Sequence, residues 1–227
     1  MGRYIGPVCK LCRREGSKLF LKGERCFVKC PIDKPSGAVI PGQHGKRRSK
    51  LTEYGKRLRE KQKTRRIAGL LERPFYNYFR RALRMPGQTG ENLLKLLETR
   101  LDNVVRRLGF ATSMSAARQT VSHGNVKVNG ARINIPSYGL KVGDVVSLVD
   151  AQKGNVRIQR AISSQIRRDF PSWLELNPEL SVALSRSKDL PIDLGAIKVE
   201  GRVKIEPTRA EMSYPVNDQY IVELYSK

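Results

Sequence analysis

The sequence contains no apolar run that approaches the roughly 20 residues needed to cross a bilayer as a helix. Its first residues, MGRYIGPVCKLCRREG, also lack the apolar stretch of a secretory signal. We therefore expect a cytoplasmic protein with no membrane partner.

Catalytic signatures are also missing. The chain has no G-x-G-x-x-G loop, no Walker phosphate-binding loop and no H-E-x-x-H motif. Of its two histidines, His44 lies in a Pro/Gly-rich stretch, and His123 ends a predicted helix. At such a helix end, a capping role or a phosphate contact is more usual than a role as a catalytic base. We predict that the chain is not an enzyme and has no small-molecule substrate.

Negative charge is scarce over most of the chain. The 44 lysines and arginines exceed the 21 acidic residues, which gives a formal net charge of +23 and a pI near 10.3. From Asp169 onward the balance is reversed, with ten acidic and seven basic residues, so residues 1–168 carry +26. Because the excess positive charge is confined to residues 1–168, we expect this part of the chain to bind a polyanionic partner. The less basic end is expected to serve packing or protein contact.

The most informative pattern lies between Thr99 and Val149. The segments TRLDNVVRRLGF and TSMSAARQTVSHG place apolar residues at helical spacing, and a glycine stops each of them. The next segment, NVKVNGARINI, alternates around Asn129-Gly130, the pair that most favours a two-residue hairpin turn. A last apolar strand follows in YGLKVGDVVSLV. Together these segments resemble a small helix–helix–hairpin RNA-binding motif found in one ribosomal protein and in several RNA-modifying enzymes.

Polar side chains of this module that find no place in its apolar core are candidate RNA contacts. A merely solvated side chain is the alternative for each of them. The candidates are Arg106, Arg107, Arg118, Gln119, His123, Lys127, Asn129, Arg132 and Lys141.

Three further helices are predicted before the module. They are LTEYGKRLREKQKTRRIAGLL with Thr52 as its cap, ERPFYNYFRRALRMPG, and TGENLLKLLET. Their core is expected to come from Phe75, Tyr78, Phe79, Ala82 and Leu83, and base stacking by the aromatic residues is the less favoured reading. Near the C-terminus, Thr208 and Glu211 predict a capping box, and a closing helix is expected from about Asn217.

The basic side chains of these helices are further candidate phosphate contacts. They are Lys56, Arg57, Arg59, Lys63, Arg65, Arg66, Arg80 and Arg81.

The four cysteines form two pairs, Cys9-x-x-Cys12 and Cys26-x-x-x-Cys30. Two such pairs can close a tetrahedral zinc site, and both spacings are typical of structural zinc. A segment this short buries too little apolar surface to fold alone, so a metal would supply the missing free energy. The site would be structural, because protein ligands fill all four positions. Two disulfides, four free thiols and, more remotely, an iron–sulfur cluster are the alternatives.

The start MGRYIGPVCKLCRR, the module and the ending VNDQYIVELYSK resemble the family of bacterial small-subunit ribosomal protein four, in its form with a four-cysteine zinc site. The resemblance implies a primary rRNA-binding protein that binds the 5′ domain of 16S rRNA, nucleates assembly of the subunit body and influences translational accuracy. It implies contact with the neighbouring small-subunit protein five. It also places a linker near the mRNA entry channel, where message or rRNA would meet Lys46, Arg47, Arg48 and Lys50. The alternative is a free-standing regulatory or stress protein that uses the same RNA-binding motif.

The expected fold class is α+β. Residues 1–45 are predicted to form a zinc-binding segment and linker, and residues 46–98 a helical domain. The resemblance implies that residues 207–227 complete this helical domain. Residues 99–206 would then form an inserted α/β RNA-binding domain with its core motif at 99–162. The segment 177–205 is longer than the resemblance implies, and a surface insertion is expected there.

Overall fold

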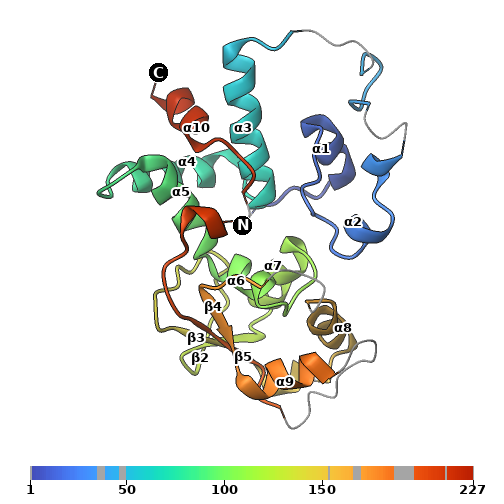
Figure 1. Cartoon of the computed structure of the whole chain (residues 1–227), viewed down its shortest axis with the longest axis vertical. Coiled ribbons are helices and arrows are strands. Elements are labelled where there is room, and N and C mark those ends of the chain that lie inside the picture. The colour runs from blue at the N-terminus through green and yellow to red at the C-terminus, as the bar shows by residue number, and fades with distance from the viewer. Residues whose placement is uncertain are drawn as a thin grey trace. The chain divides into compact units, whose positions relative to one another are not determined.

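The computed structural model describes residues 2–34, 39–45, 50–152, 154–165, 170–186, 197–212 and 214–226. The chain divides into two compact units (Figure 1). Unit 1 comprises Met1–Leu96 and Ser213–Lys227, and unit 2 comprises Leu97–Met212. Both ends of the chain therefore belong to unit 1. No helix in the described ranges is both long enough and apolar enough to cross a membrane.

Unit 1 is helical in its described parts. Its first segment contains α1 (Val8–Glu15), α2 (Arg25–Val28) and a 3-10 turn at Pro31–Asp33. The helices α3 (Glu53–Ile67), α4 (Glu72–Leu83) and α5 (Thr89–Glu98) follow, and the tail adds α10 (Asp218–Tyr225). The last two residues of α5 belong to unit 2. Two of these helices begin where the sequence predicts, α3 after the predicted cap Thr52 and α10 directly after Asn217. The side chain of Thr52 accepts a hydrogen bond from the N–H of Gly55, and that of Asn217 accepts one from Gln219.

The core of unit 1 joins the tail to the central helices. Helix α10 packs against α3 (Figure 1), and the ring of Tyr225 lies 4.7 Å from that of Phe79 and 6.4 Å from that of Phe75. Phe75, Phe79 and Ala82 are buried as predicted. The prediction for Leu83 was wrong, because this residue is 60% exposed. It is the last residue of α4, beyond the buried stretch of that helix.

Unit 2 is built on a five-stranded antiparallel sheet in the order β2-β1-β3-β5-β4. The strands are β1 (Val126–Val128), β2 (Ala131–Arg132), β3 (Val145–Leu148), β4 (Leu174–Leu176) and β5 (Glu200–Val203). The helices are α6 (Leu101–Arg107), α7 (Met114–Ser122), α8 (Val156–Gln165) and α9 (Pro178–Arg186). Short 3-10 turns lie at Asp150–Gln152 and Arg209–Glu211. The second turn carries the predicted capping box, in which Thr208 donates to the carboxylate of Glu211.

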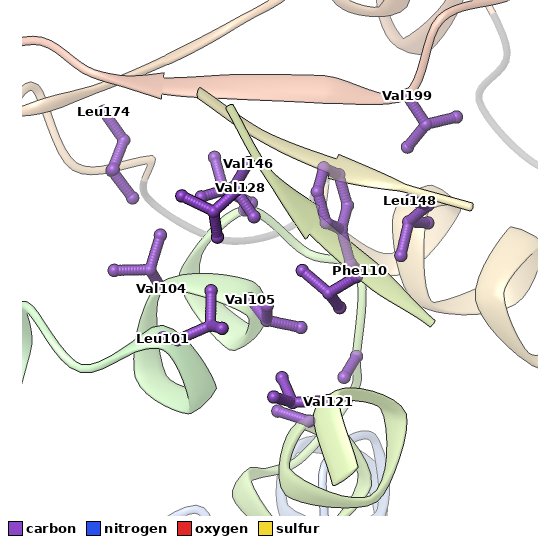
Figure 2. Packing of buried hydrophobic residues seen from close by; sticks show 14 of the residues in the cluster. Leu101, Val104, Val105, Phe110, Val121, Val128, Val146, Leu148, Leu174 and Val199 are labelled. Atoms are coloured by element: carbon purple, nitrogen blue, oxygen red, sulfur yellow. The ribbon is translucent and has the colours of Figure 1, made fainter. Parts of the chain in front are cut away.

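One apolar cluster holds unit 2 together. Figure 2 shows Leu101, Val104 and Val105 of α6 facing side chains from the sheet, among them Val128 and Val146. The alternating burial of β1 and β3 sends one side of the sheet into this cluster and leaves Lys127 and Ser147 on the other. The polar side is therefore available for contacts outside the unit.

The hairpin between β1 and β2 has the predicted turn. Asn129 has a φ of 50° and Gly130 a φ of 83°, and a two-residue type I′ turn needs positive φ at both positions. The side chain of Asn129 also donates to the carboxylate of Asp144 and accepts from the N–H of Val145. Asn129 therefore fixes the hairpin tip against the start of β3.

The segment 177–205 differs from the expected surface insertion. In its described parts it supplies α9 and β5, and β5 lies between β3 and β4 inside the sheet. Leu180, Val199 and Val203 are buried in the core cluster. A side chain at Gly201 would collide with Leu108, so the absence of a Cβ lets β5 approach α6 closely.

Candidate nucleic-acid interface

Two cationic side chains face each other across the hairpin of unit 2. Lys127 on β1 lies directly opposite Arg132 on β2. Like charges at directly opposed positions destabilise a pair of strands. An anion bound beside both would offset this repulsion, so the arrangement indicates a binding surface for phosphate.

The end of α7 extends this surface. A methyl group at Gly124 would meet Cδ of Arg132 at 3.4 Å, so the stem of Arg132 lies against the end of this helix. Gln119 and His123 are exposed there and, four residues apart, lie on the same side of the helix. We call Gln119, His123, Lys127 and Arg132 the hairpin surface. All four were predicted RNA contacts.

Lys141 and Asn129 lie at the other end of the hairpin. Lys141 is exposed, and its backbone N–H donates to the same Asp144 carboxylate that holds the side chain of Asn129. Lys141 can therefore reach a ligand, whereas the amide of Asn129 is already engaged within the turn.

The three arginines of α6 and α7 that were predicted to contact RNA form ion pairs or hydrogen bonds with polar groups of unit 2. Arg118 and Arg107 contact the fully buried carboxylates of Asp102 and Glu98, at 3.3 and 2.6 Å. Arg106 donates to the side-chain oxygen of Asn103. The expectation that Arg118 has no place in the core is wrong, because this residue is only 9% exposed. Its burial depends on Asp102, which neutralises it.

Most of the predicted cations on α3 bind other parts of unit 1. Arg59 and Arg66 both contact Glu15 of α1, Arg57 contacts Glu223 of α10, and Lys63 donates to the carbonyl of Pro215. Arg65 bonds Gln62 and lies 3.7 Å from Glu72, whereas Lys56 pairs with Glu53 on the exposed side of α3. Burial raises the pKa of Glu15, although the charges of Arg66 and Arg59 oppose this shift. These contacts make α3 a structural centre of unit 1.

Helix α4 presents a more open cationic surface. Arg80 and Arg81, both predicted contacts, are exposed, and so are Arg73 and Arg84, which the prediction missed. None of these four guanidiniums forms an ion pair with another described residue. A detectable sequence signal existed for the missed pair, since Arg73, Asn77, Arg80 and Arg84 recur every three or four residues and share one side of the helix.

Most of the predicted linker contacts are outside the described part of the chain. This holds for Lys46, Arg47 and Arg48. Lys50, the fourth member, is described and is exposed before the cap of α3.

The four cysteines line one small cavity between α1 and α2. Burial raises the pKa of the Cys12 thiol, and the charges of Cys26, Cys9 and Cys30 raise it further. Burial also raises the pKa of the Cys26 thiol, although the N–H of Lys22, which donates to Sγ of Cys26 at 3.3 Å, opposes this shift. The donor chemistry fits zinc. As placed, however, no three His, Cys, Asp or Glu side chains of the described ranges are grouped to hold a metal ion.

Comparison with known proteins matches both parts of the chain. Residues 3–98 match the family described as ribosomal protein S4/S9 N-terminal domain, and residues 99–146 match the S4 domain. Three similar proteins come from Halothermothrix orenii, Dictyoglomus thermophilum and Acidithiobacillus ferrooxidans, and each carries the name small ribosomal subunit protein uS4. They are 50%, 53% and 47% identical to this chain, over the whole length of both partners. The chain therefore belongs to the uS4 family of small-ribosomal-subunit proteins.

Proposed function

We propose that the chain is a structural, rRNA-binding constituent of the small ribosomal subunit in the cytoplasm, without catalytic activity. The observation that carries this proposal is the hairpin surface, where Lys127 and Arg132 stand opposite each other on a domain of an RNA-binding family. The net charge of +23 supports a polyanionic partner. A free-standing regulatory protein is not favoured, because the uS4 relatives match the chain over its full length.

We propose more specifically that the ligand is the 5′ domain of 16S rRNA and that binding nucleates assembly of the subunit body. Proteins recognise folded RNA mainly through its shape, phosphates and 2′-hydroxyls, because the A-form major groove is too narrow for side chains. The hairpin surface of unit 2 and the α4 arginines of unit 1 supply two cationic surfaces on two units. A protein with two such surfaces can hold two RNA segments at once and restrict their relative angle.

Binding of the full-length protein to a 5′-domain transcript across a salt series tests this proposal. The double variant Lys127→Ala/Arg132→Ala should bind less tightly and flatten the salt dependence by about one unit of slope or less per lost contact. A matched control, Lys198→Ala/Lys204→Ala, removes the same charge from exposed positions elsewhere in unit 2. Equal losses of affinity in both variants would mean that the hairpin surface contributes only general positive charge and makes no specific contact with the RNA. Equal binding of the wild type to tRNA and to the 5′ domain would contradict the rRNA assignment.

We propose that Cys9, Cys12, Cys26 and Cys30 hold one structural zinc ion. Their shared cavity supports this, since a divalent cation would stabilise thiolates grouped around one small space. Protein expressed with zinc should carry one zinc per chain by mass spectrometry. Cys9→Ser/Cys12→Ser should lose the metal and expose residues 2–34 to protease while unit 2 stays folded. Absence of bound metal, or bound iron, would contradict the proposal.

We propose two further contacts within the subunit. The less basic C-terminal third is assigned to the neighbouring small-subunit protein five, and through it to translational accuracy. The linker residues Lys46, Arg47, Arg48 and Lys50 are assigned to incoming mRNA. Neutralising all four should slow unwinding of structured mRNA by assembled subunits, and an unchanged rate would remove this role. Crosslinking of assembled subunits, followed by mass spectrometry, tests the protein contact.

A further inference from the structure

Two phenylalanine rings stack on the surface of the cysteine segment. Phe20 lies between α1 and α2, the blue helices of Figure 1, and Phe27 lies in α2. Their ring centroids are 5.0 Å apart with an interplanar angle of 28°. The residues nevertheless remain 41% and 53% exposed, and the neighbouring Val28 is 73% exposed. Large apolar side chains that are grouped on the surface and rimmed by polar residues mark interaction sites.

The backbone at this position is also unusual. Phe20 has a φ of 50°, the left-handed region that bulky side chains rarely adopt. Asn129 is the other non-glycine residue of the described chain with a positive φ, and its hairpin turn requires that conformation. Strained backbone of this kind is concentrated at binding sites, where surrounding structure holds it in place. Here it accompanies the stacking of Phe20 on Phe27.

The charged residues next to the two rings in the sequence indicate which kind of ligand the rings would bind. Lys22, Arg25 and Lys29 lie within a few residues of the rings and are exposed. None of the three forms an ion pair with another residue of the described ranges. Glu24 is the one acidic residue between Phe20 and Lys29. Exposed aromatic rings with exposed cations close to them in the sequence complement a nucleic acid strand, whose bases stack and whose phosphates carry the opposite charge.

We propose that the Phe20–Phe27 pair is a stacking platform for an unpaired base of the bound RNA. Lys22, Arg25 and Lys29 contact the phosphates that flank this base. The inference rests on the proposed rRNA-binding function and adds a recognition mode to it. The hairpin surface acts through charge, whereas the platform binds the flat face of a base and tolerates different bases.

Two double variants of the full-length, zinc-supplemented protein test the platform. Phe20→Leu/Phe27→Leu keeps apolar bulk but removes the aromatic faces, and should bind the 5′-domain transcript at least about fivefold more weakly. Because the lost contact is not ionic, the slope of affinity against salt should stay unchanged. Phe20→Tyr/Phe27→Tyr keeps both faces and should bind within about twofold of the wild type. Unchanged cysteine reactivity in both variants would show that the segment is intact.

A third variant reports stacking directly. In Phe27→Trp the new indole would be the exposed tryptophan, because Trp173 is fully buried. Addition of the transcript should quench its fluorescence. This readout does not depend on the leucine variant being folded.

The results of these experiments distinguish failure of the stacking platform from failure of the proposed rRNA-binding function. If the wild type shows no preference for the 5′ domain, the proposed function fails. If the wild type prefers it and the leucine variant binds equally well, or the tryptophan is not quenched, the platform is overturned. Normal binding to free RNA combined with poor incorporation into reconstituted subunits would assign the rings to a protein partner instead.

Discussion

The carboxylate of Asp102 neutralises two buried arginines of unit 2, Arg100 and Arg118. This carboxylate is fully buried and accepts hydrogen bonds from Arg100, whose side chain is 2% exposed. Arg118 contacts the same carboxylate from α7. A buried ion pair contributes little compared with an apolar packing of the same shape, but removal of one partner leaves the other charge uncompensated.

Asp102→Asn should therefore lower the free energy of unfolding by about 3–5 kcal/mol, the range for breaking a buried ion pair. Chemical denaturation followed through the fluorescence of Trp173, which is buried in the core of unit 2, measures it. Glu175→Gln, at an exposed position of β4, serves as the control and should shift stability by no more than about 0.5 kcal/mol. A loss below about 1 kcal/mol in Asp102→Asn would contradict the account.

The arginines of unit 1 separate into structural and binding groups by what they contact. Arg66→Ala removes a partner of Glu15, whose side chain is 1% exposed, and should cost about 1–3 kcal/mol of stability. Arg84→Ala, at an exposed position, should leave stability within about 0.5 kcal/mol but weaken rRNA binding. Thermal unfolding and salt-dependent binding of both variants check this. The reverse pattern would move the RNA contacts from α4 to α3.

Residue types and spacing predicted some of these positions and not others. Asn129-Gly130 was predictable, because positive φ is a local preference of those two residues. The burial of Arg118 was not predictable from helical periodicity, which places it on the polar side of α7. It depends on a carboxylate sixteen residues earlier, brought close only by the folding of α6 against α7.

Among the elements, α10 contacts the other helices of unit 1 through its last residue, Tyr225. The hydroxyl of Tyr225 donates to the carboxylate of Glu72 at 2.8 Å, and Lys61 donates to the same oxygen at 2.6 Å. Lys61 also lies over the ring of Tyr225. Burial alone would raise the pKa of Glu72, but the hydrogen bonds from Lys61 and Tyr225 outweigh it and lower the pKa.

Tyr225→Phe should lower the free energy of unfolding by about 0.5–1 kcal/mol at neutral pH. This lies below the usual range for a hydrogen bond to a charged group, because Glu72 is nearly half exposed and solvent screens its charge. Folded Glu72 holds its proton less tightly than it does in the unfolded chain, so its contribution is present above the ordinary pKa of 4.5 and is lost in more acidic solution. The difference between wild type and variant should shrink below about pH 4. Urea denaturation across pH measures it, and a difference that grows in acid would contradict the assignment.

Elements with strong local signals were predicted well, and long-range pairing was not. Thr52 and Asn217 mark helix starts because their side chains cap the backbone within three residues. Strand β5 has no such signal. Its place between β3 and β4 depends on pairing with segments far away in sequence and on the close approach of Gly201 to Leu108.

Across the whole molecule, the two ends of the chain build one unit and the middle builds the other. Tyr214 and Ile221 from the tail are almost fully buried, and Glu223 pairs with Arg57 of α3. The stability of unit 1 therefore depends on residues that are synthesised after unit 2. Unit 2 has its own core, in which the described residues all belong to the range 97–212.

Deletion of residues 213–227 should consequently destabilise unit 1 and spare unit 2. Loss of the buried Tyr214 and Ile221 and of the Tyr225 contacts with Phe75 and Phe79 removes apolar burial worth several kcal/mol, at about 1.5–3 kcal/mol per large side chain. Hydrogen exchange measured by mass spectrometry should show faster exchange in α3 and α4 and unchanged exchange in α6, α7 and β3. A control that removes only residues 226–227 keeps Tyr225 and should exchange like the full chain. Equal acceleration in both units would mean that the tail supports the chain as a single cooperative body, because only then would its loss be felt in a core to which it contributes no side chain.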